Sequence, residues 1–143
     1  MKLFSIALAL AVSLGAIESA NAAGAEGVWL TGGGKAKVRI TKCGQGLCGS
    51  VISLAQPNDP DTGKPKTDKF NSDPKLRARP AVGIRVILGM KPDGENKWSG
   101  QVYNAEDGKT YSGHMTLAGA NALKLEGCVL GVLCKSQDWR RVN

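Results

Sequence analysis

Short runs in which apolar and polar residues alternate recur along the chain, and they constrain its fold more than any other feature. Eight such runs are predicted strands, at residues 26–31, 35–41, 47–54, 81–90, 97–104, 110–118, 122–128 and 133–142. Each has one apolar and one polar face, as a half-buried strand requires. Glycine-rich or Asp-Gly turns separate them, which favours successive antiparallel hairpins. This pattern predicts an all-β fold, an antiparallel eight-stranded up-and-down β-barrel that closes on itself and leaves no free edge.

The chain begins with the pattern of a secretory signal peptide, residues 1–22. Lys2 precedes an apolar run, and Ala20 and Ala22 supply the small residues that a signal peptidase accepts. The apolar run is shorter than the roughly 20 residues that span a bilayer as a helix, so we expect no transmembrane segment in the mature protein. Residues 23–143 have the size of a single domain. We therefore expect one exported domain, either periplasmic or secreted.

The chain carries a formal net charge of +7 at pH 7. Lys2 and Glu18 cancel within the signal peptide, so this charge belongs to the mature domain. A basic domain favours anionic surroundings, and two readings stay open: peripheral contact with anionic envelope components, or a solvated surface that aids solubility. The basic residues are scattered and do not interleave with aromatic residues, which argues against nucleic acid as a partner.

All four cysteines lie in the mature domain, as Cys43 with Cys48 and Cys128 with Cys134. An even number of cysteines in an exported domain favours disulfides, although several connectivities are open. We favour these two local pairs, because glycine within each spacing lets the segment close as a tight turn between strands. A zinc site is the weaker alternative, since paired zinc ligands usually stand about two to four residues apart. We expect no metal and no cofactor.

No catalytic arrangement stands out in the sequence. His114 is the only histidine and falls on the polar face of its strand, where an exposed structural role is favoured over general-base catalysis. Neither a nucleophile elbow nor a phosphate-binding loop is present. Residues 58–63 resemble a calcium loop, but Lys69 stands where the glutamate ligand belongs and Pro60 interrupts the spacing, so we expect a turn.

Residues 55–80 form a long segment rich in proline, aspartate, asparagine and lysine. A loop of this length is uncommon inside a compact domain and is usually either functional or flexible. It is therefore either a lid or entrance, or a mobile surface excursion. Asp73, Arg77 and Arg79 could anchor it through salt bridges.

Gly27-Val28-Trp29 stands in the first predicted strand, and Trp139 and Arg141 stand in the last. This pairing resembles the calycin superfamily, the lipocalins and their relatives, in which a Gly-x-Trp motif opens the barrel and a basic residue packs across the tryptophan. The resemblance implies that Trp29, Trp139 and Arg141 close the barrel. Arg141 shares a strand face with Trp139 and Arg140 lies on the other face; alternation alone does not choose between the two arginines, and we favour Arg141.

Four further segments, at residues 47–49, 71–80, 98–111 and 127–141, look like a family of small exported bacterial proteins of uncharacterised function, grouped as a domain of unknown function. Ala105 departs from the family, which usually has proline at that place in its turn. The resemblance implies a lipocalin-like β-barrel with a cavity for a hydrophobic ligand.

We therefore expect non-enzymatic binding of a small, fatty-acid-like ligand inside the barrel. The expected lining consists of inward apolar side chains, namely Val38, Ile40, Ile52, Val86, Met115, Leu117, Leu123 and Leu125. Arg77, Tyr103 and Asn104 would grip a polar or anionic head group at the mouth, although a hairpin in which Asn104 bonds local backbone is the favoured reading of that segment. The alternatives are an envelope structural or interaction protein, with a filled barrel and a basic surface, and, with least support, an enzyme of unknown class.

Overall fold

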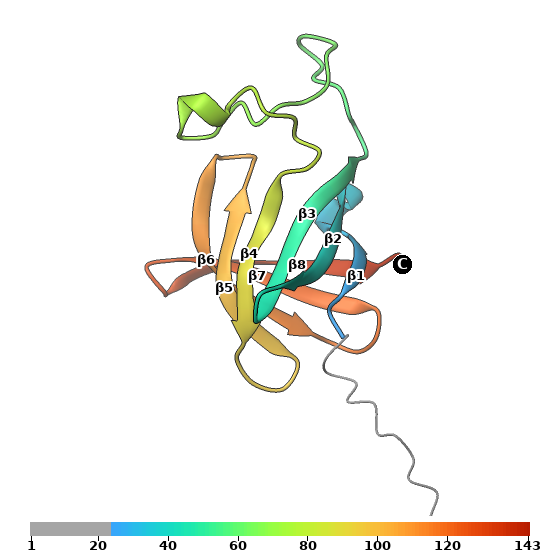
Figure 1. The fold of residues 1–143 in the computed structure, drawn as a ribbon, viewed down its shortest axis with the longest axis vertical. Coiled ribbons are helices and arrows are strands. Elements are labelled where there is room, and N and C mark those ends of the chain that lie inside the picture. Colours follow the sequence, from blue (N-terminus) through green and yellow to red (C-terminus); the bar gives the residue numbers. More distant parts are fainter. Residues whose placement is uncertain (1–23) are drawn as a thin grey trace, which may run out of the picture.

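The computed structural model describes residues 24–143, so the predicted signal peptide lies outside the described residues. The strands are β1 (Gly27–Leu30), β2 (Ala36–Cys43), β3 (Gly46–Leu54), β4 (Arg85–Pro92), β5 (Lys97–Asn104), β6 (Lys109–Leu117), β7 (Ala122–Val129) and β8 (Leu133–Arg141), with short 3-10 helices η1 (Gly32–Gly34) and η2 (Pro74–Leu76) (Figure 1). Within the described residues, no helix is long and apolar enough to cross a membrane.

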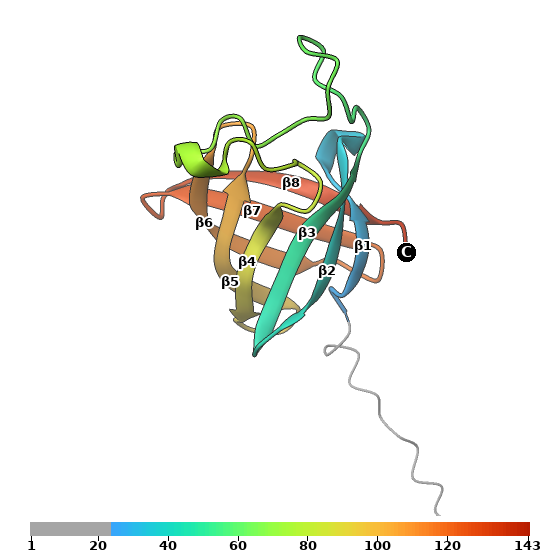
Figure 2. The ribbon, with the colours of Figure 1, turned by 45° about the horizontal axis from the view of Figure 1, so that its top comes forward.

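The strands form a closed barrel in sequence order (Figure 2). Each strand pairs antiparallel with the next, and β8 returns to β1 through two residue pairs. The predicted antiparallel eight-stranded up-and-down barrel is therefore confirmed. β4 begins at Arg85 and not at residue 81, because the chain before it belongs to the preceding loop. There the N–H of Ala81 donates to the carbonyl of Lys66, and Gly83 turns the chain with a φ of 101°.

Inward apolar side chains fill the barrel. The buried residues form one cluster, the core cluster, which consists of Ala25, Trp29, Val38, Ile40, Leu47, Val51, Ile87, Met90, Trp98, Val102, Met115, Leu123 and Trp139. Strand register brings these positions together: Ile87 lies opposite Val102, and Trp98 lies opposite Met115. Cross-strand pairs of this kind are the unit from which a sheet gains stability. The interior is thus a packed hydrophobic core.

Trp29 and Arg141 close one end of the barrel. The guanidinium carbon of Arg141 lies 4.4 Å from the centre of the Trp29 ring, a contact of about 0.5–2 kcal/mol. The same guanidinium donates hydrogen bonds to three backbone carbonyls, those of Gly24, Glu26 and Ala120. Trp139 is buried in the core cluster, whereas Arg140 is exposed. The structure therefore places Arg141, and not Arg140, over Trp29.

The cysteines form two disulfides, Cys43–Cys48 and Cys128–Cys134, which is the predicted pairing. The first spans the turn between β2 and β3, and the second spans the turn between β7 and β8. Because all four sulfurs are joined in pairs, none is a thiolate that could bind zinc. Two disulfides indicate an oxidising, extracytoplasmic compartment.

Candidate functional site

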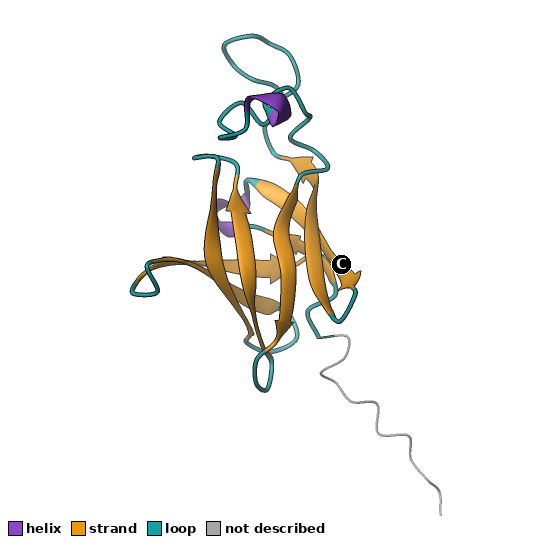
Figure 3. Ribbon diagram, turned by 60° about the vertical axis from the view of Figure 1, so that its left-hand side comes forward, coloured by secondary structure: helices purple, strands orange, loops and turns teal. Residues whose placement is uncertain are grey.

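The segment between β3 and β4, residues 55–84, is called the long loop here. Figure 3 shows it folding over the end of the barrel at which β5 and β6 are connected. It has local order of its own, with two isolated bridges and η2. The expected turn at residues 58–63 is confirmed: the carboxylate of Asp59 accepts the N–H of Asp61 at 2.8 Å, and Lys69 pairs with the same carboxylate at 2.9 Å.

Asp68 anchors the long loop to the barrel. Its carboxylate is completely buried and accepts hydrogen bonds from Asn71, Arg79 and Tyr103, at 2.8, 2.8 and 2.5 Å. Burial alone would raise the pKa of Asp68, but the three hydrogen bonds and the charge of Arg79 outweigh it and hold the pKa below its usual value. Burial and the hydrogen bond to Asp68 raise the pKa of Tyr103 to about 12. The loop is thus held by a charged carboxylate and a neutral phenol.

A glycine allows the long loop to approach the barrel closely. Gly108 lies in the turn between β5 and β6 with a φ of 72°, and a Cβ atom built on it would lie 1.7 Å from the backbone oxygen of Phe70. No residue with a side chain fits at that distance. Gly108 therefore lets the backbone of the long loop rest directly on this turn.

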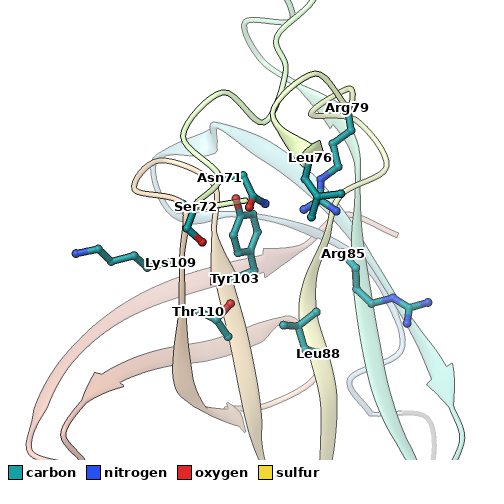
Figure 4. A pocket seen from close by; sticks show the side chains of 10 residues that line it. Asn71, Ser72, Leu76, Arg79, Arg85, Leu88, Tyr103, Lys109 and Thr110 are labelled. Carbon is teal, nitrogen blue, oxygen red and sulfur yellow. The ribbon is translucent and has the colours of Figure 1, made fainter. Parts of the chain in front are cut away.

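The long loop and the outer face of β4, β5 and β6 border an open groove of about 610 Å³, the loop groove (Figure 4). Its lining residues are Asn71, Ser72, Leu76, Arg79, Arg85, Leu88, Tyr103, Gly108, Lys109 and Thr110. Leu88, Tyr103 and Thr110 come from the three strands, and Tyr103 pairs directly with Thr110. Their sequence neighbours Ile87 and Val102 belong to the core cluster, so strand alternation places the groove outside the barrel.

The lining combines apolar surface with positive charge. Leu76 and Leu88 supply the apolar surface, and three of the ten lining residues are cationic while none is acidic. Arg79 is already paired with a carboxylate. Arg85 and Lys109, in contrast, form no ion pair with another described residue. This arrangement suits a ligand with an apolar body and an anionic head group.

None of the eight residues predicted to line the barrel interior lines the loop groove. Val38, Ile40, Met115 and Leu123 are part of the core cluster, and Val86, Leu117 and Leu125 pack against it. Ile52 lies outside the cluster, because its neighbour Val51 takes the inward position of β3. Apart from Ile52, these apolar side chains pack in or against the core cluster, which stabilises the fold.

Of the three residues predicted to grip a head group, only Tyr103 lines the groove. The Nε of Arg77 donates at 2.8 Å to a backbone carbonyl within the long loop. The side chain of Asn104 accepts a backbone N–H at 2.9 Å in the turn after β5, as the hairpin alternative expected. His114, for which an exposed structural role was expected, is exposed on its strand and is not part of the groove.

The anchor of the long loop differs from the one expected from the sequence. Arg79 pairs with Asp68, a residue that the sequence analysis did not single out, while Asp73 accepts the N–H of Lys75 and caps η2. The groove residues were missed as a set, yet most of them lie within residues 71–80 and 98–111. These two segments carried the family resemblance, and the fold brings them together in space.

The chain is similar to a protein of known structure. Protein HP1028 from the human pathogen Helicobacter pylori, described as belonging to the lipocalin family, is 26% identical, with 82% of each chain covered and a TM-score of 0.70. No curated protein matches the chain. A family model described as an uncharacterized protein conserved in bacteria matches residues 27–141, which include all eight strands. The chain therefore belongs to this bacterial family of uncharacterised proteins, DUF2147, with a lipocalin-like barrel.

Proposed function

We propose that this protein is an exported, non-enzymatic binding protein that takes a small fatty-acid-like anion in the loop groove. The observation that carries this proposal is the lining of the groove, in which two leucines lie beside cationic side chains and no carboxylate is present. A site at the cell envelope, in the periplasm or outside the cell, agrees with the two disulfides.

The size and shape of the groove support this proposal. A volume of about 610 Å³ lies within the range of small-molecule sites. Leu76 approaches from the long loop and Leu88 from β4, so an apolar chain would be covered on two sides (Figure 4). Arg85 and Lys109 lie at opposite sides of the groove (Figure 4), so a head group would form charge-assisted hydrogen bonds with one of these two cations, according to the end of the groove that it occupies.

Binding is favoured over catalysis because the groove lacks the groups that general acid-base chemistry needs. Its described lining contains no histidine, cysteine or carboxylate. Its phenol, Tyr103, has a pKa of about 12 and therefore keeps its proton at neutral pH. The groove can accordingly position an anion but has no base that would activate a nucleophile.

Calorimetric titration with dodecanoate and with dodecyl maltoside tests the proposal, because the two ligands share an apolar body and differ in head-group charge. The double variant Arg85→Ser/Lys109→Ser should bind dodecanoate about tenfold more weakly or worse, and bind the neutral detergent unchanged. The matched control Arg39→Ser/Lys42→Ser removes two exposed cations of β2 and should bind like the unmodified protein.

Two results would overturn the proposal. One is an unmodified protein that binds neither dodecanoate nor longer fatty acids. The other is a loss of dodecanoate affinity that is equal in the groove variant and in the β2 control, since this would assign the binding to the overall basic charge.

A second candidate function is that of an envelope interaction protein. It is favoured by the packed interior of the barrel together with the net charge of +7. Salt-sensitive adsorption to anionic envelope components by a protein that carries no extractable ligand would support this candidate over the first.

A further inference from the structure

The turn between β7 and β8 carries four exposed apolar side chains, Val129, Leu130, Val132 and Leu133, which we call the apolar tip. Their exposed fractions are 44%, 88%, 78% and 69%. The Cys128–Cys134 disulfide closes the base of the tip. Figures 1 and 3 show this hairpin projecting beyond the neighbouring strands. A contiguous apolar surface that the fold does not cover marks a place of interaction.

The backbone conformation at the tip is unfavourable for Leu130. Leu130 and Gly131 have φ angles of 55° and 70°, and the N–H of Val132 reaches back to the carbonyl of Val129. Such a turn favours asparagine before the glycine, whereas a leucine with positive φ is strained. Packing does not offset this strain, because Leu130 is almost fully exposed. The turn thus exposes a leucine although this lowers the stability of the fold.

The charged groups nearest the tip in the sequence are Lys124, Glu126 and Lys135, which sum to +1. Glu126 is paired with Lys124 at 2.8 Å, and its carboxylate lies within 4.8 Å of the Cys128 and Cys134 sulfurs at the base of the tip. Lys135 stands two positions after Leu133. The strand that continues from the tip is polar, with Lys135, Ser136 and Gln137 exposed. The apolar surface is therefore confined to the tip, and the domain that carries it has a net charge of +7.

A lipid bilayer fits this surface better than a protein does. A stable protein interface takes about 20–30 residues from each partner, far more than a convex tip of four side chains can offer. A bilayer with anionic lipids, in contrast, offers a fluid apolar layer beneath negative head groups, which matches an apolar tip on a domain of net charge +7.

We propose that the apolar tip inserts into the facing leaflet of a bilayer that contains anionic lipids and so docks the barrel on a membrane surface. The disulfide holds the tip in its projecting shape before contact, so little conformational freedom is lost on insertion. This role is independent of ligand binding in the loop groove.

Leu130→Asn tests the proposal, because it removes the most exposed apolar side chain and also supplies the residue that the turn favours. Flotation with vesicles of phosphatidylcholine and phosphatidylglycerol should show binding weakened by about tenfold or more. Thermal unfolding should show a stability that is equal or higher. Val82→Asn, at an apolar residue of the long loop that is 47% exposed, is the matched control and should bind vesicles unchanged.

Depth of insertion gives a second, independent measurement. In Val132→Trp, the new indole should be quenched by lipids brominated on their chains, whereas the native Trp29, Trp98 and Trp139 are only 0%, 7% and 4% exposed and should not be. Vesicle binding that Leu130→Asn leaves unchanged would overturn the proposal, as would an unquenched indole. Self-association that depends on Leu130, without vesicle binding, would assign the tip to a second copy of the chain.

Discussion

The two faces of the sheet formed by β4, β5 and β6 differ in what they contact. The inner face presents Ile87, Val102 and Met115 to the core cluster, whereas the outer face presents Leu88, Tyr103 and Thr110 to the long loop and the groove. Successive residues of one strand, such as Val102 and Tyr103, thus belong to different environments. Strand alternation therefore gives the two faces different roles: the inner face stabilises the fold, and the outer face is available for recognition.

The largest effect should come from the inner face. Met115→Ala removes a completely buried side chain and should lower the free energy of unfolding by about 2–5 kcal/mol, since the cavity left behind is only partly refilled. Urea unfolding measures this loss. Dodecanoate affinity should stay unchanged under conditions where the variant is folded; a parallel loss of affinity would mean that the ligand enters the barrel.

A smaller effect is expected where the long loop rests on the outer face. Gly108→Ala places a Cβ atom against the Phe70 carbonyl and should cost about 1–3 kcal/mol through strain. Hydrogen exchange should accelerate at the Asp68 and Asn71 amides, which bond within the loop, while the amides of the barrel strands stay protected. Equal acceleration in the barrel would show that loop and barrel form one cooperative unit.

Tyr103→Phe removes one of the three donors to the buried Asp68 carboxylate and should cost about 1–2 kcal/mol at neutral pH. The pKa of Tyr103 is raised from 10.0 to about 12, so the folded protein holds this proton more tightly than the unfolded chain does. Its contribution is therefore complete below pH 10.0 and is lost as the pH rises through about 12. Urea unfolding across this range should show a decline that the variant lacks. A decline of equal size in Tyr103→Phe would assign it to other groups.

The smallest effect should come from the ion pair between Lys35, beside β2, and Glu106, beside β5. Both side chains are about 70% exposed, and surface pairs of this kind contribute about 0–1 kcal/mol. Glu106→Gln should therefore change the free energy of unfolding by less than about 0.5 kcal/mol. Dodecanoate affinity should also be unchanged. A gain in affinity would indicate that the pair restricts access to a site inside the barrel.

Much of the barrel could be predicted from the sequence because its signals are local. Alternation at residues 97–104 gives the bounds of β5 as the structure has them. The disulfides could be paired because their cysteines stand five and six positions apart, a spacing that a hairpin turn closes by itself. β4 was predicted four residues too early, since Ala81 and Val82 continue the apolar pattern although they belong to the long loop.

The loop groove could not be predicted, because its parts have no shared local signal. Leu88, Tyr103 and Thr110 stand on three strands, and only the strand register shows that they share the outer face. Asp68 lies in a segment rich in charged residues, where an aspartate is normally solvated. Its burial depends on contact with Tyr103, which stands 35 residues further along the chain and donates a hydrogen bond to it.

The sequence by itself determined the class of fold, the number of strands and the pairing of the cysteines, because alternation, turn residues and short spacings act between neighbours in the chain. The tryptophan that closes the barrel was indicated by the resemblance to the calycins. The tertiary structure decided that the interior is packed and that the long loop lies against the outer face. These outcomes depend on whether side chains from distant segments pack together and donate hydrogen bonds to the same buried carboxylate. Periodicity along the chain does not predict such long-range contacts.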